Sequence, residues 1–145
     1  MSPIQILFPM AGMVLLTFAV GVAMLGLRFR AVARGEINPR YFLLNRGGRV
    51  PEYLARVEQN YTNLFELPVL FYVLVLALYV TASVTPSQLW LAWGFVLTRV
   101  LHTLVHTTVN RLRWRMRIFS AGALLLIAAW VSFILHLLDR QVGAG

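Results

Sequence analysis

Four long apolar runs constrain this chain more than any other feature. They cover roughly residues 3–27, 64–84, 88–109 and 118–138 of the 145. A helix of about 20 apolar residues crosses the hydrocarbon core of a bilayer. Water is absent there, so each run must satisfy its own backbone groups as a helix. The runs therefore predict an all-α integral membrane protein with four membrane-spanning helices.

The composition agrees with this interpretation and excludes several kinds of chemistry. Charged residues make up 12% of the chain and hydrophobic residues 59%, whereas a soluble domain carries about 25% charged residues. The chain has no cysteine, which excludes disulfides and cysteine-bound metals. The first apolar run is followed rather than preceded by arginines, and it is longer than the core of a signal peptide. We therefore expect it to be retained as the first spanning helix.

Arginine accounts for all thirteen basic residues, and the net charge is +8. The segment 28–62 holds seven arginines, Arg46 among them, and three glutamates. The segment 110–117 holds four arginines and no acid. Positively charged loops stay in the cytoplasm, so we expect both segments there and both termini on the opposite side. Because the arginines flank apolar runs, we expect membrane lipids rather than nucleic acid beside them.

The length of 145 residues predicts one domain, residues 1–145, and local breakers predict where its helices begin and bend. Pro51 suits the first turn of a helix. No breaker follows until Pro68, which should kink that helix. Short loops make neighbouring helices antiparallel, which predicts an up-down four-helix bundle. The predicted helices cover residues 3–29, 51–84, 87–114 and 117–139.

The second predicted helix carries a polar stripe into the membrane. At about 100° per residue, its polar side chains fall within an arc of about 120°. They are Glu52, Arg56, Gln59, Asn60, Asn63 and Glu66. The stripe has two interpretations. It lines a ligand cleft, or it is a seam of hydrogen bonds between helices, which Asn and Gln form in membranes.

The third predicted helix carries a narrower cationic stripe. Its members recur every three or four residues and fall within an arc of about 80°. They are Arg99, His102, His106, Asn110, Arg113 and Arg117. Arg99 lies near the middle of its apolar run, where an arginine costs roughly 2.5–3.5 kcal/mol. It should therefore face protein or a water-filled cleft.

Together the two stripes predict a cationic cleft that opens to the cytoplasm and binds an anion. Glu66 is the acid placed to hold an ammonium group of that ligand. His102 and His106 are four residues apart and could instead bind a metal or haem. Only Glu66 offers a further ligand nearby, so no metal site is predicted.

The run RVEQNYTNLFELP resembles a helix signature of the membrane-associated proteins in eicosanoid and glutathione metabolism, the MAPEG superfamily. The shared residues are Arg56, Val57, Asn63, Glu66 and Pro68. The run LTRVLHTLVHTTVNRLR resembles the family's third helix, in which arginines flank the ligand-contacting aromatic positions. The pattern NLFELPVLFY with RVLHTLVHTTVN is similar to the bacterial branch. That resemblance implies the bacterial inner membrane, with both termini periplasmic.

The resemblance also implies an assembly and a site. The four-helix bundle would form a homotrimer, with glutathione as co-substrate bound between subunits near the cytoplasmic side. Arg113 falls where the family places the arginine that stabilises the glutathione thiolate, and it is the implied catalytic residue. The implied glutathione-binding residues are Arg30, Arg56, Asn60, Asn63, Glu66, Arg99, His102 and His106.

The implied function is a membrane-bound, glutathione-dependent transferase or peroxidase. Its substrates would be apolar electrophiles or lipid hydroperoxides that arrive from the bilayer. The chain has Gln59 where many glutathione-using members have arginine, and His102 and His106 where they have tyrosine. These differences motivate an alternative, a non-catalytic membrane accessory protein or a lipid- or anion-binding protein of the same fold. A small channel or transporter ranks third, because the chain shows no internal repeat or broken pair of helices.

Overall fold

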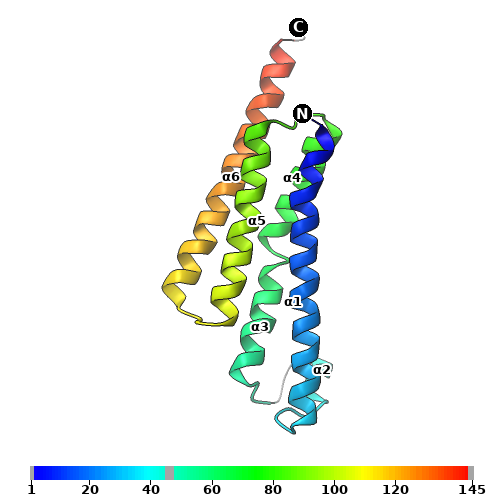
Figure 1. The fold of residues 1–145 in the computed structure, drawn as a ribbon, viewed down its shortest axis with the longest axis vertical. Helices are drawn as coiled ribbons and strands as arrows, with labels where there is room; N and C mark the ends of the chain where they lie inside the picture. Colours follow the sequence, from blue (N-terminus) through cyan, green and yellow to red (C-terminus); the bar gives the residue numbers. More distant parts are fainter. Residues whose placement is uncertain (1, 45–47, 144–145) are drawn as a thin grey trace.

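The computed structural model describes residues 2–44 and 48–143, so Arg46 lies outside the described residues. The described part of the chain is mostly helical and contains no strand. Its elements are a short 3₁₀ helix η1 (Pro3–Ile6), α1 (Leu7–Ala33), α2 (Tyr41–Leu44), α3 (Glu52–Asn63), α4 (Leu67–Val80), α5 (Pro86–Thr107) and α6 (Leu112–Val142). Figure 1 shows an elongated bundle in which the long helices lie side by side.

Four helical stretches are long and apolar enough to cross a membrane. They are Pro3–Ala33, Glu52–Val80, Pro86–Thr107 and Leu112–Val142. Both termini lie at one end of the bundle, and α2 and the turn between α5 and α6 lie toward the other (Figure 1). This arrangement confirms the all-α, up-down four-helix bundle. The side of the membrane that each end faces stays a prediction.

The predicted helix 51–84 is divided by a break at residues 64–66 into α3 and α4. Pro68 has no N–H for the carbonyl of Leu64, and its ring would clash with that carbonyl in a continuous helix. Glu66, at the start of α4, takes the non-helical angles φ −92° and ψ −96°. The predicted kink is therefore confirmed, and Asn63 becomes the last residue of α3.

The predicted helix 87–114 is wrong at its end, because α5 stops at Thr107 and α6 starts at Leu112. Asn110 has a φ of 49°, in the left-handed region that asparagine tolerates better than most residues. Its N–H donates to the carbonyl of Val105 at 2.7 Å, which closes the turn. Arg113 and Arg117 therefore lie on α6, and the cationic stripe does not continue along one helix.

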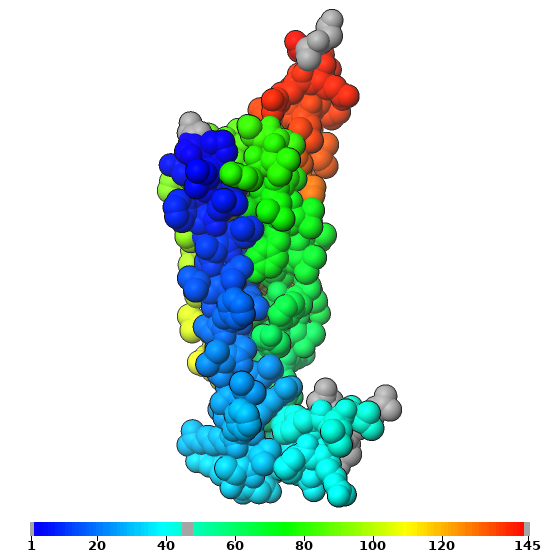
Figure 2. Space-filling model, turned by 90° about the vertical axis from the view of Figure 1, so that its right-hand side faces the viewer, coloured from blue at the N-terminus to red at the C-terminus, as the bar shows by residue number. Residues whose placement is uncertain are grey.

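The centre of the apolar core lies between α4, α5 and α6, and Met13 and Val20 of α1 belong to the same buried cluster. Phe71 of α4 stacks on Phe95 of α5 with ring centroids 4.8 Å apart, and Leu126 and Phe133 of α6 pack against the same cluster. The end of α6 extends beyond the other helices (Figure 2). Arg140 ties it to the bundle by donating from Nη1 to the carbonyl of Thr81 at 2.8 Å.

Candidate functional site

Helix α5 turns its polar side chains into the bundle. Arg99 is 1% exposed, His102 is 5% exposed and His106 is fully buried. Their spacing of three and four residues places them on one face of the helix. The prediction that Arg99 faces protein rather than lipid is confirmed.

Arg99 contacts neighbouring groups of the same chain, although its Nε is buried with no hydrogen-bond partner within the described residues. Its Nη2 donates to the carbonyl of Phe119 at 3.2 Å. The guanidinium carbon lies 4.9 Å from the ring centroid of Phe119 and 5.3 Å from that of Phe95. Within the described residues it forms no ion pair. These contacts replace water around the charge with a carbonyl and two aromatic rings.

A hollow of about 250 Å³ opens between α3, α5 and α6. It is lined by Asn63, His102, Leu112, Arg115, Met116, Phe119 and Ser120. Within the described part of the chain, neither ring nitrogen of His102 has a hydrogen-bond partner. Buried polar atoms in proteins are nearly always bonded, so His102 is free to bond a molecule in the hollow.

Arg115 is the arginine of this hollow, and the sequence did not single it out. Its Nη1 donates to Asn110 Oδ1 at 2.9 Å, and its Nη2 donates to Gln59 Oε1 at 3.3 Å. The same Gln59 oxygen lies 3.1 Å from Nε2 of His106. Gln59 and Asn110 thus fix the guanidinium beside the buried histidines.

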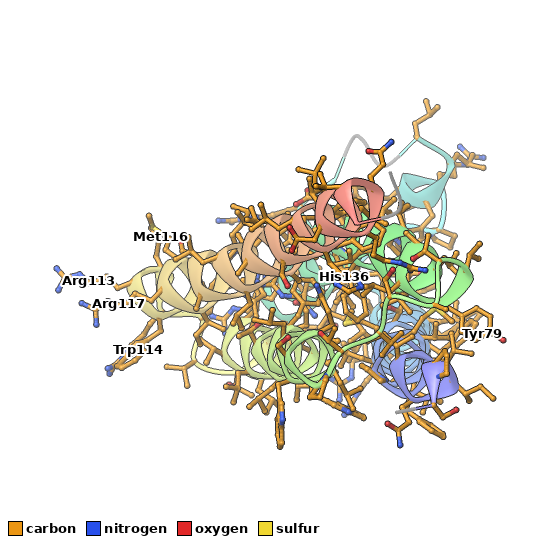
Figure 3. All side chains as sticks on the ribbon, turned by 90° about the horizontal axis from the view of Figure 1, so that it is seen from above. Tyr79, Arg113, Trp114, Met116, Arg117 and His136 are labelled. Atoms are coloured by element: carbon orange, nitrogen blue, oxygen red, sulfur yellow. The ribbon has the colours of Figure 1, made fainter. Side chains whose placement is uncertain are left out.

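The sequence indicates Arg115 as a residue of this hollow once α6 is known to begin at Leu112. From Leu112, the positions 112, 115, 116 and 119 follow the helical spacing of one face, and all four line the hollow. Arg113 and Arg117 belong to the opposite face. They are exposed, and Figure 3 shows both projecting outward from the start of α6.

The structure separates the other predicted ligand-binding residues into three groups. Asn63 lines the hollow with His102. Arg56 pairs with Glu52 and donates to the carbonyl of Thr108 at 3.0 Å, just past the end of α5. Arg30 and Glu66 are exposed on the single chain. Whether these residues bind glutathione stays a prediction.

His102 and His106 form an edge-to-face pair with ring centroids 5.5 Å apart. Within the described residues, no group of three or more His, Cys, Asp or Glu side chains could hold a metal ion. The open position beside His102 is shared with Arg115, a cation, so it suits an anion better than a metal ion.

Asn60 belongs to a seam between α3 and α5. It is fully buried, and its Nδ2 donates to Oγ1 of Thr103 at 3.2 Å. This geometry supports the hydrogen-bond seam for this member of the polar stripe.

The variant Asn60→Leu should be destabilised by about 1–2 kcal/mol, because Thr103 loses its buried partner. Unfolding of the detergent-solubilised protein would measure this. In a double-mutant cycle with Thr103→Val, the coupling energy should be about 0.6–1.7 kcal/mol. Additive effects would show that the pair does not interact.

The geometry is that of a membrane bundle with a cationic, partly polar hollow between α3, α5 and α6. A profile of the MAPEG family matches residues 6–135. The chain belongs to the MAPEG family. The family includes glutathione transferases and peroxidases as well as non-catalytic members. No curated protein and no solved structure matched the chain. MAPEG membership and the four spanning helices make it an integral membrane protein.

Proposed function

We propose that this MAPEG protein binds glutathione in the hollow between α3, α5 and α6. It uses the tripeptide as co-substrate in a transferase or peroxidase reaction with apolar electrophiles or lipid hydroperoxides. The observation that carries the proposal is that His102 and Arg115 line the same hollow. Within the described residues, the ring nitrogens of His102 have no hydrogen-bond partner. The remaining wall, with Leu112, Met116 and Phe119, suits an apolar second substrate.

Arg115 supplies the charge that this chemistry needs. A free thiol has a pKa of about 8.5, and an adjacent cation stabilises the thiolate. The neutral imidazole of His102 can accept the thiol proton. The thiolate sulfur then attacks an electrophilic carbon, and the leaving group departs with its electron pair. With a hydroperoxide, sulfur attacks the terminal oxygen, the O–O bond breaks, and the released alkoxide takes the proton.

A homotrimer would complete this site. Glu66 and Arg30 are exposed on the single chain, although the family resemblance assigns both to glutathione. In a trimer they would face a neighbouring copy, where Glu66 could hold the ammonium group of the tripeptide. The proposal therefore has a neighbouring copy close the open side of the hollow, so that glutathione would contact two subunits.

Glutathione should raise the thermal stability of the purified protein in detergent. At about 100 times its dissociation constant, a ligand stabilises the folded state by ~2.7 kcal/mol. An S-alkyl glutathione lacks the thiolate, but it should still stabilise, because its alkyl group can contact Leu112 and Met116. The control is the analogue that carries an ethyl group in place of the cysteine side chain. It should bind more weakly, since it offers no thiolate to Arg115.

The hydrogen bond that Arg115 donates to Gln59 favours a second candidate function. Both terminal nitrogens of the guanidinium already donate to side chains of the same chain. A non-catalytic accessory or anion-binding protein would need only a guanidinium that is fixed in this way. Stabilisation by simple anions, with none by glutathione or its S-alkyl analogue, would select that function.

A further inference from the structure

Three arginines surround an exposed tryptophan at the start of α6. Arg111, Arg113 and Arg117 are exposed, and within the described residues none of them forms an ion pair. Figure 3 shows Arg113, Trp114 and Arg117 projecting away from the other helices. The sequence has no acid between Glu66 and Asp139. The positive charge of this group is therefore uncompensated within its own part of the chain.

The same residues border an open hollow of about 540 Å³, lined by Arg111, Leu112, Arg113 and Trp114. The guanidinium carbon of Arg117 lies 5.7 Å from the Trp114 ring, and Trp114 is 52% exposed. Exposed apolar side chains flank the arginines, since Leu112 is 64% exposed and Met116 is 61% exposed. Cationic and apolar groups thus meet at the end of a membrane-spanning helix.

We infer that this hollow binds the headgroup of an anionic phospholipid. Arginine forks match the paired oxygens of a phosphodiester. Tryptophan lies at headgroup depth in membrane proteins. Leu112 and Trp114 line the same hollow and would contact the apolar part of the lipid. A nucleic acid would find the phosphate contacts but would leave these apolar groups unused. The inference does not depend on the proposed glutathione chemistry.

The charge of the lipid headgroup should decide how strongly the lipid binds in this hollow. Arginines near a membrane surface each strengthen anionic-lipid binding by about fivefold. Replacing all three should therefore weaken binding by about 10²-fold. A zwitterionic lipid, whose headgroup has no net charge, should gain little from them.

The test uses the full chain in phosphatidylcholine vesicles that contain a minor fraction of lipid with brominated acyl chains. Bromine quenches nearby tryptophan fluorescence. Brominated phosphatidylglycerol should quench more than brominated phosphatidylcholine, and Trp114→Phe should remove the difference. The triple variant Arg111→Gln, Arg113→Gln and Arg117→Gln should lose the preference. These side chains are exposed, so the variant should keep its helical circular dichroism.

The matched control removes the same charge elsewhere, as Arg34→Gln, Arg40→Gln and Arg49→Gln. These arginines are also exposed, and this variant should keep the preference. Equal losses in the two triple variants would show general charge attraction and would overturn a localised site. Loss of the preference on adding inorganic phosphate would assign the arginines to a free anion and would also overturn it. The inference would also be overturned if the wild-type protein showed no preference for the anionic lipid.

Discussion

The variant Arg115→Gln should lose about 10²–10³-fold in glutathione-dependent turnover, the usual effect of removing one donor that stabilises a developing anion. Arg115 is the charged side chain of the hollow that contains His102. Glutamine keeps some hydrogen bonding but no charge, so the thiolate would lose its cation. Turnover of a chlorinated aromatic and of a lipid hydroperoxide would measure the loss. Ultraviolet absorbance of the bound thiolate gives a readout that a structural role alone would not move.

Three further variants make the test decisive. Arg113→Gln examines the position that the family resemblance assigns to the thiolate. A larger loss at Arg113 than at Arg115 would reinstate that assignment and reject the hollow as the reaction site. Arg40→Gln removes an exposed loop charge and should leave turnover near wild type. Arg115→Lys keeps a cation without the fork that bonds Asn110 and Gln59, and it should recover part of the activity.

Some features could be predicted from the sequence because they follow from apolar length, from the sterics of proline or from the cost of a charge in lipid. The spans follow from apolar length, the break before α4 follows from Pro68, and the inward placement of Arg99 follows from the cost of charge in lipid. Each of these outcomes depends on a penalty of several kcal/mol that no local detail reverses.

Those features that depend on one residue's backbone angle could not be predicted in the same way. A constant angle per residue would continue α5 through Asn110 and would place Arg113 on the same face as His102 and His106. The left-handed turn at Asn110 ended the helix and reset its phase, so Arg115 rather than Arg113 entered the hollow. Periodicity likewise placed Asn60 and Asn63 in one arc. Only packing shows that Asn60 bonds Thr103 while Asn63 lines the hollow.

The variant Gly122→Ala should be destabilised by about 1–3 kcal/mol, the usual cost of overfilling a packed site. Gly122 of α6 is buried against Arg99 and Thr98 of α5. An added Cβ would overlap Nη2 of Arg99 and would lie 2.6 Å from Oγ1 of Thr98. The guanidinium would have to shift against its carbonyl and its two aromatic rings. Thermal or denaturant unfolding in detergent would measure the change.

The same substitution at Gly26 provides the control. A Cβ there meets no atom within 4 Å, so Gly26→Ala should stabilise α1 by up to about 1 kcal/mol, the helix-propensity gain of alanine over glycine. The double variant Arg99→Met with Gly122→Ala tests the cause. If the displaced guanidinium carries the cost, methionine should recover part of the lost stability, because its flexible side chain adapts to the added methyl group. Equal effects at Gly122 and Gly26 would mean that Gly122 is not needed to seat Arg99.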